Sequence, residues 1–306
     1  MERERRVIAL GFFDGIHIGH QALFSRTKER AAQLGATPSV ISFDEHPENV
    51  VFGCRRVSLI NTPEDRVRLI KSVCGIDDTI FLHFDEEMMR MPWESFAEWV
   101  VEHFGAVHLV AGYDFTCGYK GEGTAEKLRE KCARMGVGCD IVDAVKLDGV
   151  VISSSMIREK LENGEITTAN RYLGHMHIFT DSVQYGYKLG RKLGVPTINM
   201  RFPDGMIEMV RGVYATRAYL EDGRYFDAVT NIGVRPTVSG GNTTSVESHL
   251  LDYSGYLYGQ KVTLEFYRFL RREEKFDDID ALQHRIMADI ADVREYFAEN
   301  GQKADK

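Results

Sequence analysis

The sequence has few of the residues that build cross-linked, metal-bound or membrane-embedded folds. Its five cysteines are an odd number without a CxxC pair, so neither a disulfide framework nor a zinc site is indicated, and a reducing cytoplasm is the expected location. No apolar stretch approaches the roughly 20 residues that cross a bilayer. Basic residues precede the first apolar run, but no small-residue cleavage site follows it, so we interpret this run as a strand. No membrane partner is expected.

Positive charge is also scarce. The chain has 38 Lys and Arg against 46 Asp and Glu, which gives a formal net charge of −8 at pH 7. Nucleic acids require a basic surface, and no stripe of Lys and Arg supplies one, so a nucleic-acid partner is not expected. The negative net charge does not exclude small anionic ligands, because such ligands need only a few positive groups at their binding site. A weak homo-oligomer is left open.

The length of 306 residues exceeds what one hydrophobic core usually supports, so two domains are expected. An apolar fraction of 43% and a charged fraction of 27% are typical of a folded protein. The two halves differ in pattern. We expect an α/β domain over residues 1–174 and an all-β domain over residues 175–306.

Short apolar runs alternate with amphipathic stretches in the first half, which predicts a Rossmann-like parallel sheet flanked by helices. Thr62 and Pro63 are typical of a helix cap and a first helical residue. Strands are expected over residues 6–10, 39–43, 79–84 and 107–111, and helices over residues 19–34, 63–75 and 92–104. Four polar clusters follow apolar runs: GFFDGIHIGH, SFDEHP, GYDFTCG and SSSMIR. Because the carboxyl ends of parallel strands form one crevice, these clusters should converge on one site.

From about residue 177 the chain has short strand-like runs with turn signals, which predicts an all-β barrel. Glu221-Asp222-Gly223 indicates a hairpin turn, and residues 262–269 indicate a further strand. A closing helix is expected near the end of the chain. Its apolar stripe, which we interpret as core contact alone, consists of Ile279, Leu282, Ile286, Ile290, Val293 and Phe297.

Two histidines three residues apart follow the first expected strand. Gly15 and Gly19 allow the backbone to approach a ligand closely, and the start of the next helix offers free N–H groups to a phosphate. His17 and His20 would share one helical face and could donate hydrogen bonds as charge builds up in phosphoryl or nucleotidyl transfer. A lone histidine is usually structural, but this pair between glycines favours a catalytic role.

SSSMIR contains a second candidate phosphate site. Ser154 and Ser155 begin an expected helix, where hydroxyl and amide groups can cradle phosphates. Arg158, one turn further, could neutralise a leaving pyrophosphate. In a sequence without the histidine motif, this stretch would more often be a helix cap. Because the histidine motif is also present, a functional role is favoured.

FDGIHIGH resembles the HxGH motif of the nucleotidyltransferase superfamily. It is close to the form found in the adenylyltransferase half of the bacterial bifunctional riboflavin kinase/FAD synthetase family, and SSSMIR resembles the second signature of that family. The resemblance implies catalytic roles for His17, His20 and Arg158. It also implies nucleotide binding at Gly11, Phe13, Asp14, Gly15, Gly19, Gly112, Asp114, Ser154 and Ser155.

A glycine-rich loop followed by PTIN opens the second half. Thr197 and Asn199 are two residues apart, so on an extended chain they face the same side and offer oxygens suited to Mg²⁺ with ATP. A polar strand edge explains the same residues equally well. The stretch resembles the riboflavin kinase signature GRxxGxPTxN, and NIGVRPT, VESH and LYG follow in the order of that family.

This second resemblance implies that Glu247 is a general base, which takes the proton from the ribityl 5′-hydroxyl of riboflavin. The chain would then phosphorylate riboflavin to FMN with Mg-ATP, and adenylylate FMN with ATP to give FAD and pyrophosphate. The other implied ligands are Gly186, Gly190 and Arg191 for the nucleotide, Asn231, Arg235 and Arg271 for the flavin, and Thr197 and Asn199 for magnesium.

The sequence departs from the family pattern in loops expected to contact the nucleotide or the flavin. Cys117 lies in the DFTCG stretch, Gly121 stands where an arginine is usual, and Glu45 replaces a common proline. Two alternatives therefore stay open: a riboflavin kinase with a weakened adenylyltransferase, and a flavin-binding regulatory protein on the same folds. The second is disfavoured, because a pure binding protein needs no general base.

Overall fold

The computed structural model describes residues 4–186, 190, 193–236 and 242–300. Contacts divide the chain into two compact units, Met1–Met156 and Ile157–Lys306. The first contains a parallel sheet and the second an antiparallel one, as the sequence predicts. Within the described ranges, no helix has both the length and the apolar character that a membrane span needs.

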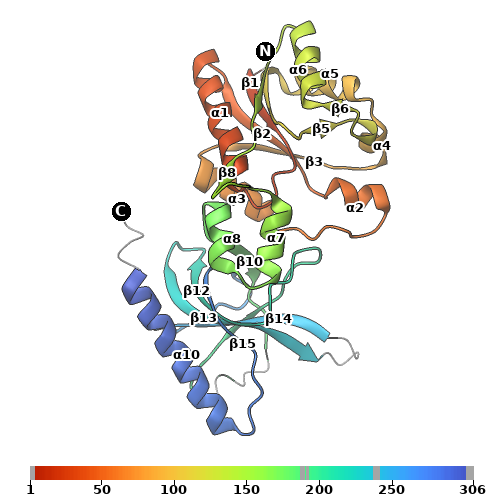
Figure 1. The fold of residues 1–306 in the computed structure, drawn as a ribbon. Coiled ribbons are helices and arrows are strands. Elements are labelled where there is room, and N and C mark those ends of the chain that lie inside the picture. The colour runs from red at the N-terminus through yellow and green to blue at the C-terminus, as the bar shows by residue number, and fades with distance from the viewer. Residues whose placement is uncertain (1–3, 187–189, 191–192, 237–241, 301–306) are drawn as a thin grey trace. The chain divides into compact units, whose positions relative to one another are not determined.

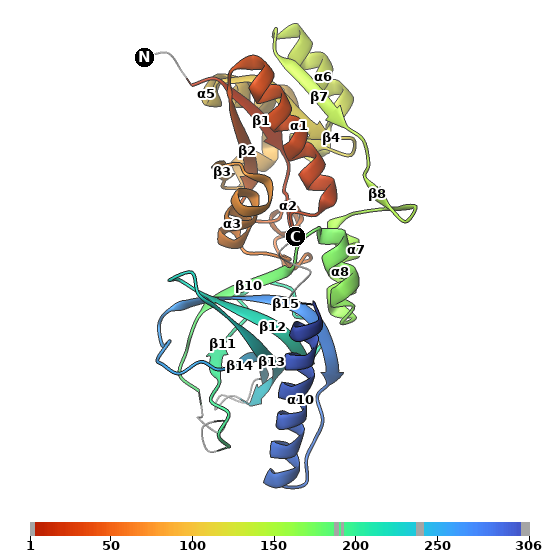
Figure 2. The ribbon, with the colours of Figure 1, turned by 90° about the vertical axis from the view of Figure 1, so that its left-hand side faces the viewer.

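The first unit is built on a five-stranded parallel sheet (Figure 1), whose strand order β3-β2-β1-β4-β7 can be followed in Figure 2. Helices α5 and α6 contribute Phe96, Val100 and Leu128 to the core on one face of this sheet. The predicted α/β fold is therefore confirmed. The strands are β1 (Arg6–Leu10), β2 (Thr37–Phe43), β3 (Asp78–Leu82), β4 (Ala106–Gly112) and β7 (Gly138–Val142), and the longer helices are α1 (Ile18–Leu34), α3 (Pro63–Cys74), α5 (Trp93–Phe104) and α6 (Ala125–Arg134).

Helix α3 begins and ends as its sequence predicts. The Thr62 side chain accepts a hydrogen bond from the backbone N–H of Asp65, Pro63 is the first helical residue, and Gly75 ends the helix at a φ of 66°. Only a residue tolerant of the left-handed region closes a helix in this way without strain. Shorter elements fill the connections: α2 (Pro47–Phe52), α4 (Glu86–Arg90), β5 (Thr116–Cys117), the 3-10 turn Tyr119–Gly121, β6 (Gly123–Thr124), β8 (Lys146–Leu147) and β9 (Val150–Val151).

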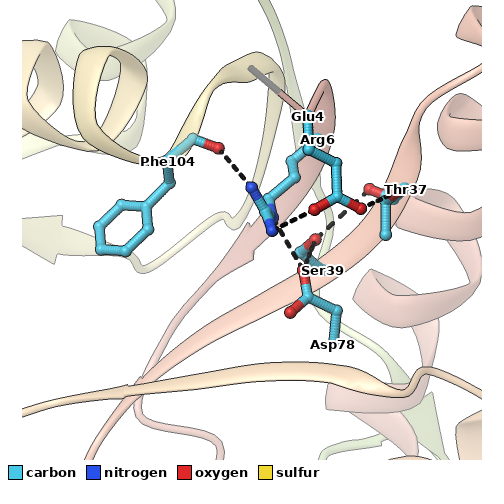
Figure 3. A network of polar contacts seen from close by, with 6 residues as sticks. All are labelled: Glu4, Arg6, Thr37, Ser39, Asp78 and Phe104. Atoms are coloured by element: carbon cyan, nitrogen blue, oxygen red, sulfur yellow. Dashed lines mark hydrogen bonds and ion pairs between the residues drawn. The ribbon is translucent and has the colours of Figure 1, made fainter. Parts of the chain in front are cut away.

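A polar network joins the amino-terminal ends of β1, β2 and β3 (Figure 3). Arg6 donates from Nε to Asp78 at 2.9 Å and from Nη1 to the carbonyl oxygen of Phe104 at 3.2 Å. The hydroxyl of Ser39 donates to the same Asp78 carboxylate at 2.5 Å. These bonds fasten the strands at one edge of the sheet. The carboxyl ends, where ligands bind in such folds, lie at the opposite edge.

The second unit contains a six-stranded antiparallel half-barrel with the order β10-β15-β12-β13-β14-β11 (Figure 2). An isolated antiparallel bridge between Gln184 and Asn199 joins the two edges of this sheet. The predicted hairpin at residues 221–223 connects β12 and β13. The strands are β10 (His177–Ser182), β11 (Ile198–Met200), β12 (Gly212–Leu220), β13 (Tyr225–Pro236), β14 (Asn242–Leu250) and β15 (Lys261–Arg272).

The closing helix is α10 (Ile279–Asn300), which packs along β12 and β13 (Figure 2). Val293 and Phe297 are buried in the core beneath it, as predicted. Ile279 is 61% exposed, so the expectation of core contact is wrong at the start of the helix. Leu282 and Ile286 line a cavity of the barrel, so the stripe also has a second role that its spacing did not indicate.

Helix α8 (Ile166–Leu173) is fastened to the barrel by one buried amide. The side chain of Asn170 donates to the carbonyl oxygen of Phe266 and accepts from the backbone N–H of His177, both at 2.8 Å. Contacts therefore group α8 with the barrel unit, whereas the predicted boundary at 174/175 falls after this helix. Where the two activities separate along the chain stays a prediction.

His177 is fully buried at the start of β10, and neither of its ring nitrogens has a hydrogen-bond partner among the described residues. Burial, with a smaller contribution from the charge of His175, lowers the pKa of His177 to about 3. An unfolded histidine has a pKa of about 6.5. Between these two values the unfolded chain binds a proton that the folded chain does not, so the free energy of unfolding falls as the pH drops below about 6.5.

We expect the wild-type barrel to lose about 2 kcal/mol more stability than His177→Leu between pH 6.5 and 4.5, because leucine cannot take up the proton. Urea unfolding at both pH values, followed by hydrogen exchange of β10 and β15, measures the difference. The contributions of the other titrating groups to the change in unfolding free energy cancel between the two proteins. Equal losses in both proteins would show that His177 does not control this pH dependence.

Candidate active sites

The strand order reverses between β1 and β4, and in sheets of this kind ligands bind outside the carboxyl ends of the strands at such a point. β1 pairs with β2 on one side and with β4 on the other, so the loops after β1 and β4 lead away in different directions. The predicted clusters GFFDGIHIGH and GYDFTCG begin at these two strand ends, and SFDEHP begins at the end of β2. The sheet topology therefore brings three of the four predicted clusters to one edge.

The loop after β1 holds an unusual backbone conformation. Phe13 and Ile16 have φ values of 53° and 44°, and Gly15 between them has a φ of 83°. Positive φ is costly for a β-branched residue such as Ile16, and it persists only where the surroundings enforce it. Both apolar side chains are buried. A Cβ on Gly11 would lie 2.7 Å from the Phe13 ring, so the loop also requires glycine at that position.

His17 and His20 lie together at the start of α1. His17 is the N-cap, and its Nδ1 accepts a hydrogen bond from the backbone N–H of His20 at 3.3 Å. The two imidazole rings stack with centroids 3.5 Å apart, and the Phe13 ring meets His20 edge-on at 5.2 Å. A Cβ on Gly19 would lie 3.0 Å from the His17 ring, which explains the glycine between the histidines.

The pKa of His20 is held well below the usual range of histidine. Burial is the main cause, and the charges of His17 and Arg66 act in the same direction. Nδ1 of His20 is buried and has no partner in the described part of the chain. At neutral pH the ring is therefore uncharged and retains one N–H donor, which can serve an anionic oxygen.

The start of α7 (Ser154–Glu162) lies against the loop after β1. The hydroxyl of Ser154 donates to the carbonyl oxygen of Asp14 at 2.9 Å. Ser153 caps the helix, because its hydroxyl accepts from the backbone N–H of Met156. The two predicted signatures thus meet through Ser154. Ser155 is exposed, and Arg158 is half-buried one turn further along the helix.

The carboxylate of Asp14 is almost fully buried and engaged inside the protein. It accepts hydrogen bonds from the backbone N–H groups of Ile60, at 3.0 and 2.9 Å, and Asn61, at 3.1 Å. Asp14 therefore fastens the segment before α3 to the histidine loop. Its predicted contact with the nucleotide stays a prediction.

The loop after β4 explains two of the departures from the family pattern. Cys117 is buried, its thiol points to the carbonyl oxygen of Gly123 at 3.7 Å, and burial raises its pKa to about 12, so it is an inert core residue. Gly121 has a φ of 67°, so an arginine there would need a strained backbone. Gly112 is buried at the strand end, and Asp114 is exposed two residues later.

The predicted kinase residues lie in one row across five strands of the half-barrel. Glu247 on β14 pairs with Asn199 on β11 and with Asn231 on β13. Asn231 pairs in turn with Val213, which pairs with Arg271 on β15. Residues paired in register project from the same face of a sheet. The fold therefore brings together four residues that are far apart in the sequence.

A cavity of about 430 Å³ opens over this row between the half-barrel and α10. Its walls include Glu247, Asn231 and Arg271, the loop residues Gly190 and Thr197, and the apolar side chains of α10. A second cavity of about 500 Å³ lies beside Thr197 and is lined by Pro196, Leu257 and several tyrosines. Thr197 borders both cavities, so ligands in the two would meet at this residue.

Other predicted ligands are constrained by packing. Arg271 makes a two-bond ion pair with the buried Asp289 of α10, at 2.9 and 2.7 Å, so its guanidinium anchors the helix. A Cβ on Gly186 would lie 2.4 Å from the amide of Asn199, so only glycine leaves room for that side chain. Arg191 and the side chain of Arg235 lie outside the described residues.

Two features of these sites have no recognisable signal in the sequence. Tyr256 and Tyr258 line the second cavity, and Tyr258 stacks on Tyr185 at 4.3 Å, yet aromatic residues in a turn-rich segment have no diagnostic spacing. Arg66 is fully buried beneath the histidine loop. Nothing in the sequence distinguishes it from the exposed arginine two positions later on the same helix.

Comparison with known proteins identifies both halves. Residues 1–156 match the family model described as FAD synthetase, and residues 173–297 match the one described as riboflavin kinase. The bifunctional riboflavin kinase/FMN adenylyltransferase of Bacillus subtilis (strain 168) is 32% identical over 300 residues, which cover 97% of this chain and 94% of the relative. The protein of the same description from Escherichia coli (strain K12) is 30% identical over 298 residues, with 96% and 94% covered. The crystal structure of a macrolide-efflux protein from Streptococcus pneumoniae matches with a TM-score of 0.84 at 27% identity, over 96% of this chain and 95% of that one.

Proposed function

The chain belongs to the bifunctional riboflavin kinase/FMN adenylyltransferase family and makes FMN and FAD, and from this premise we propose how its residues divide the two reactions. Adenylyl transfer is assigned to the histidine loop and α7. Riboflavin phosphorylation is assigned to the cavity over the Glu247 row. We propose that the two functional domains cover residues 1–174 and 175–306, which is supported by the family matches over residues 1–156 and 173–297.

In the adenylyltransferase, a phosphate oxygen of FMN attacks the α-phosphorus of ATP, and pyrophosphate leaves. His17 and His20 would donate hydrogen bonds to the phosphate oxygens as negative charge shifts toward the leaving group. The stacked rings and the low pKa of His20 support this role, because a neutral ring donates without repelling a nearby cation. Arg158 would stabilise the pyrophosphate.

In the kinase, we place the flavin in the cavity under α10 and the nucleotide in the tyrosine-lined cavity. The observation that carries this assignment is the position of Thr197 on both cavities, with Glu247 on the first. Glu247 would take the proton from the 5′-hydroxyl, whose oxygen then attacks the γ-phosphorus of ATP, and ADP leaves. Leu282, Ile286 and Ile290 offer an apolar wall to the flavin ring.

Magnesium fits the donor set of this site. Thr197 and Asn199 provide a hydroxyl and an amide oxygen, which are hard ligands of the kind that Mg²⁺ prefers. The absence of a Cβ at Gly186 leaves room for the Asn199 amide in this position, since a Cβ there would collide with it. When held by Thr197 and Asn199 together with ATP, the ion would neutralise negative charge on the phosphate groups.

Thr197→Val and Asn199→Leu are expected to raise the Mg²⁺ concentration needed for riboflavin phosphorylation by roughly ten- to a hundred-fold, because each removes an oxygen ligand. Conversion of supplied FMN into FAD should be unchanged. Chromatographic separation of FMN and FAD at graded Mg²⁺ concentrations measures both reactions. Thr180→Val is the matched control, since Thr180 bonds to Thr263 elsewhere in the barrel. An unchanged Mg²⁺ requirement in both variants would remove these residues from the metal site.

A cytoplasmic location and a weak homo-oligomer stay predictions. The weakened-adenylyltransferase alternative is tested by the same assay, because it compares the rates of FMN and FAD formation on one preparation.

A further inference from the structure

Arg66 is the largest fully buried side chain of the described residues, with no exposed surface. It is the fourth residue of α3, and its backbone N–H donates to the carbonyl oxygen of Thr62 in the first turn. The guanidinium extends under the carboxyl edge of the parallel sheet. A cation in such a place is costly, since burial disfavours the charged form.

The donors of Arg66 fasten the ends of two strands. Nη1 donates to the carbonyl oxygen of Phe12 at 2.8 Å and to the hydroxyl oxygen of Ser42 at 3.0 Å, and Nη2 donates to the carbonyl oxygen of Phe43 at 2.8 Å. Ser42 donates its own hydroxyl to the same Phe12 carbonyl at 2.7 Å. This carbonyl directly precedes Phe13, where the strained turn toward the histidines begins.

The charge of Arg66 has no matching anion at contact distance. No carboxylate of the described chain forms an ion pair with it, and its Nε has no hydrogen-bond partner there. Its guanidinium carbon lies 4.6 Å from the Phe12 ring centroid and 4.8 Å from that of Phe81. Burial lowers the pKa of Arg66 to about 10, and the more distant Asp14 and Asp44 oppose the shift, so the group stays charged at neutral pH.

We propose that Arg66 is a positioning residue for adenylyl transfer, which holds the histidine loop through the Phe12 carbonyl and supplies a buried positive charge beside the phosphate-binding histidines. It does not touch the substrate. Packing alone would not need an arginine here, since an apolar side chain fills a core without the cost of an unpaired charge. The inference rests on the roles proposed for His17 and His20.

The charged groups that act on the His20 ring are His17, from the loop after β1, and Arg66, from α3. Loss of the Arg66 charge should therefore raise the pKa of His20, whereas loss of a neutral donor to the Phe12 carbonyl should not. This difference separates an electrostatic role from a purely structural one. Ser42→Ala provides the neutral comparison, because it removes the other donor to that carbonyl.

The test uses the full-length enzyme with Arg66→Met, Arg66→Lys and Ser42→Ala. We expect Arg66→Met to lower kcat for FMN adenylylation by roughly ten- to a hundred-fold, with little change in KM for ATP or FMN, because the histidines lose their alignment rather than a substrate contact. NMR titration of His20 should show a higher pKa in Arg66→Met and a nearly unchanged one in Arg66→Lys and Ser42→Ala. Arg66→Lys should recover part of the turnover.

Riboflavin phosphorylation in the same preparations shows whether the kinase half of the chain is intact. Arg68→Met is the matched control variant, since Arg68 is exposed on the same helix. Turnover of Arg66→Met within about twofold of the wild type would overturn the proposal. A loss of turnover in Arg66→Met with an unchanged pKa of His20 would also overturn the proposal, because a purely structural role of Arg66 predicts that result. If Arg66→Met does not fold, Arg66→Gln takes its place, because it keeps an N–H donor and loses the charge, and wild-type turnover with an unchanged His20 pKa in Arg66→Gln overturns the proposal. Full activity of His20→Ala would instead contradict the histidine assignment on which the inference rests.

Discussion

Glu247→Gln is expected to slow riboflavin phosphorylation by roughly a hundred- to ten-thousand-fold, because glutamine keeps the shape of the side chain but cannot accept the proton of the 5′-hydroxyl. Its position supports so large an effect. Glu247 lines the cavity beside Thr197, and it is flanked in register by Asn199 and Asn231. These amide neighbours can orient the carboxylate and the hydroxyl that it activates.

Binding and chemistry can be separated in this variant. Riboflavin affinity, measured by quenching of flavin fluorescence, should change little, and FMN adenylylation from supplied FMN should be normal. Glu273→Gln is the matched control, because Glu273 lines the same cavity but is exposed outside the Glu247 row. Full kinase activity in Glu247→Gln would remove Glu247 from the mechanism.

The second large effect concerns the histidine pair. His17→Ala and His20→Ala should each reduce FAD formation by roughly a hundred- to a thousand-fold, as expected when a donor to developing charge is lost. FMN formation should stay nearly intact, because the kinase residues lie in the other unit. Single-turnover conversion of FMN, beside a riboflavin kinase assay, measures both.

The capping role of His17 requires one more variant. His17→Ala also removes the acceptor for the His20 N–H, a loss that costs about 1 kcal/mol of helix stability. His17→Asn restores an N-cap acceptor without an imidazole. If His17→Asn forms FAD at the wild-type rate, the His17 ring acts only as a cap. Equal loss of FMN and FAD in the alanine variants would contradict separate sites.

The parts of this fold that the sequence predicts are those governed by local rules. The alternation of strand and helix patterns predicts the parallel sheet, and the Thr62-Pro63 cap predicts the start of α3. The clusters at the ends of β1 and β4 could be assigned to one edge because parallel strands end together. Asp-Gly turn chemistry likewise predicts the hairpin of the half-barrel.

Features set by long-range packing could not be predicted. The row from Asn199 through Glu247 to Arg271 depends on strand register, which a single sequence does not encode locally. Helical spacing describes the α10 stripe but cannot tell a core contact from a cavity wall, as Leu282 shows. The burial of Arg66 depends on carbonyl groups of two other strand ends, which no motif on α3 reveals.

The bridge between Gln184 and Asn199 would couple ligand binding to the stability of the half-barrel. The backbone carbonyl of Asn199 accepts from Gln184 at 2.8 Å where the two sheet edges meet, and the side chain of the same residue is the proposed magnesium ligand. A ligand that binds only the joined barrel stabilises it by about 2.7 kcal/mol at a hundred times its Kd. Magnesium and ATP bound at Asn199 would therefore also stabilise the pairing of the two sheet edges.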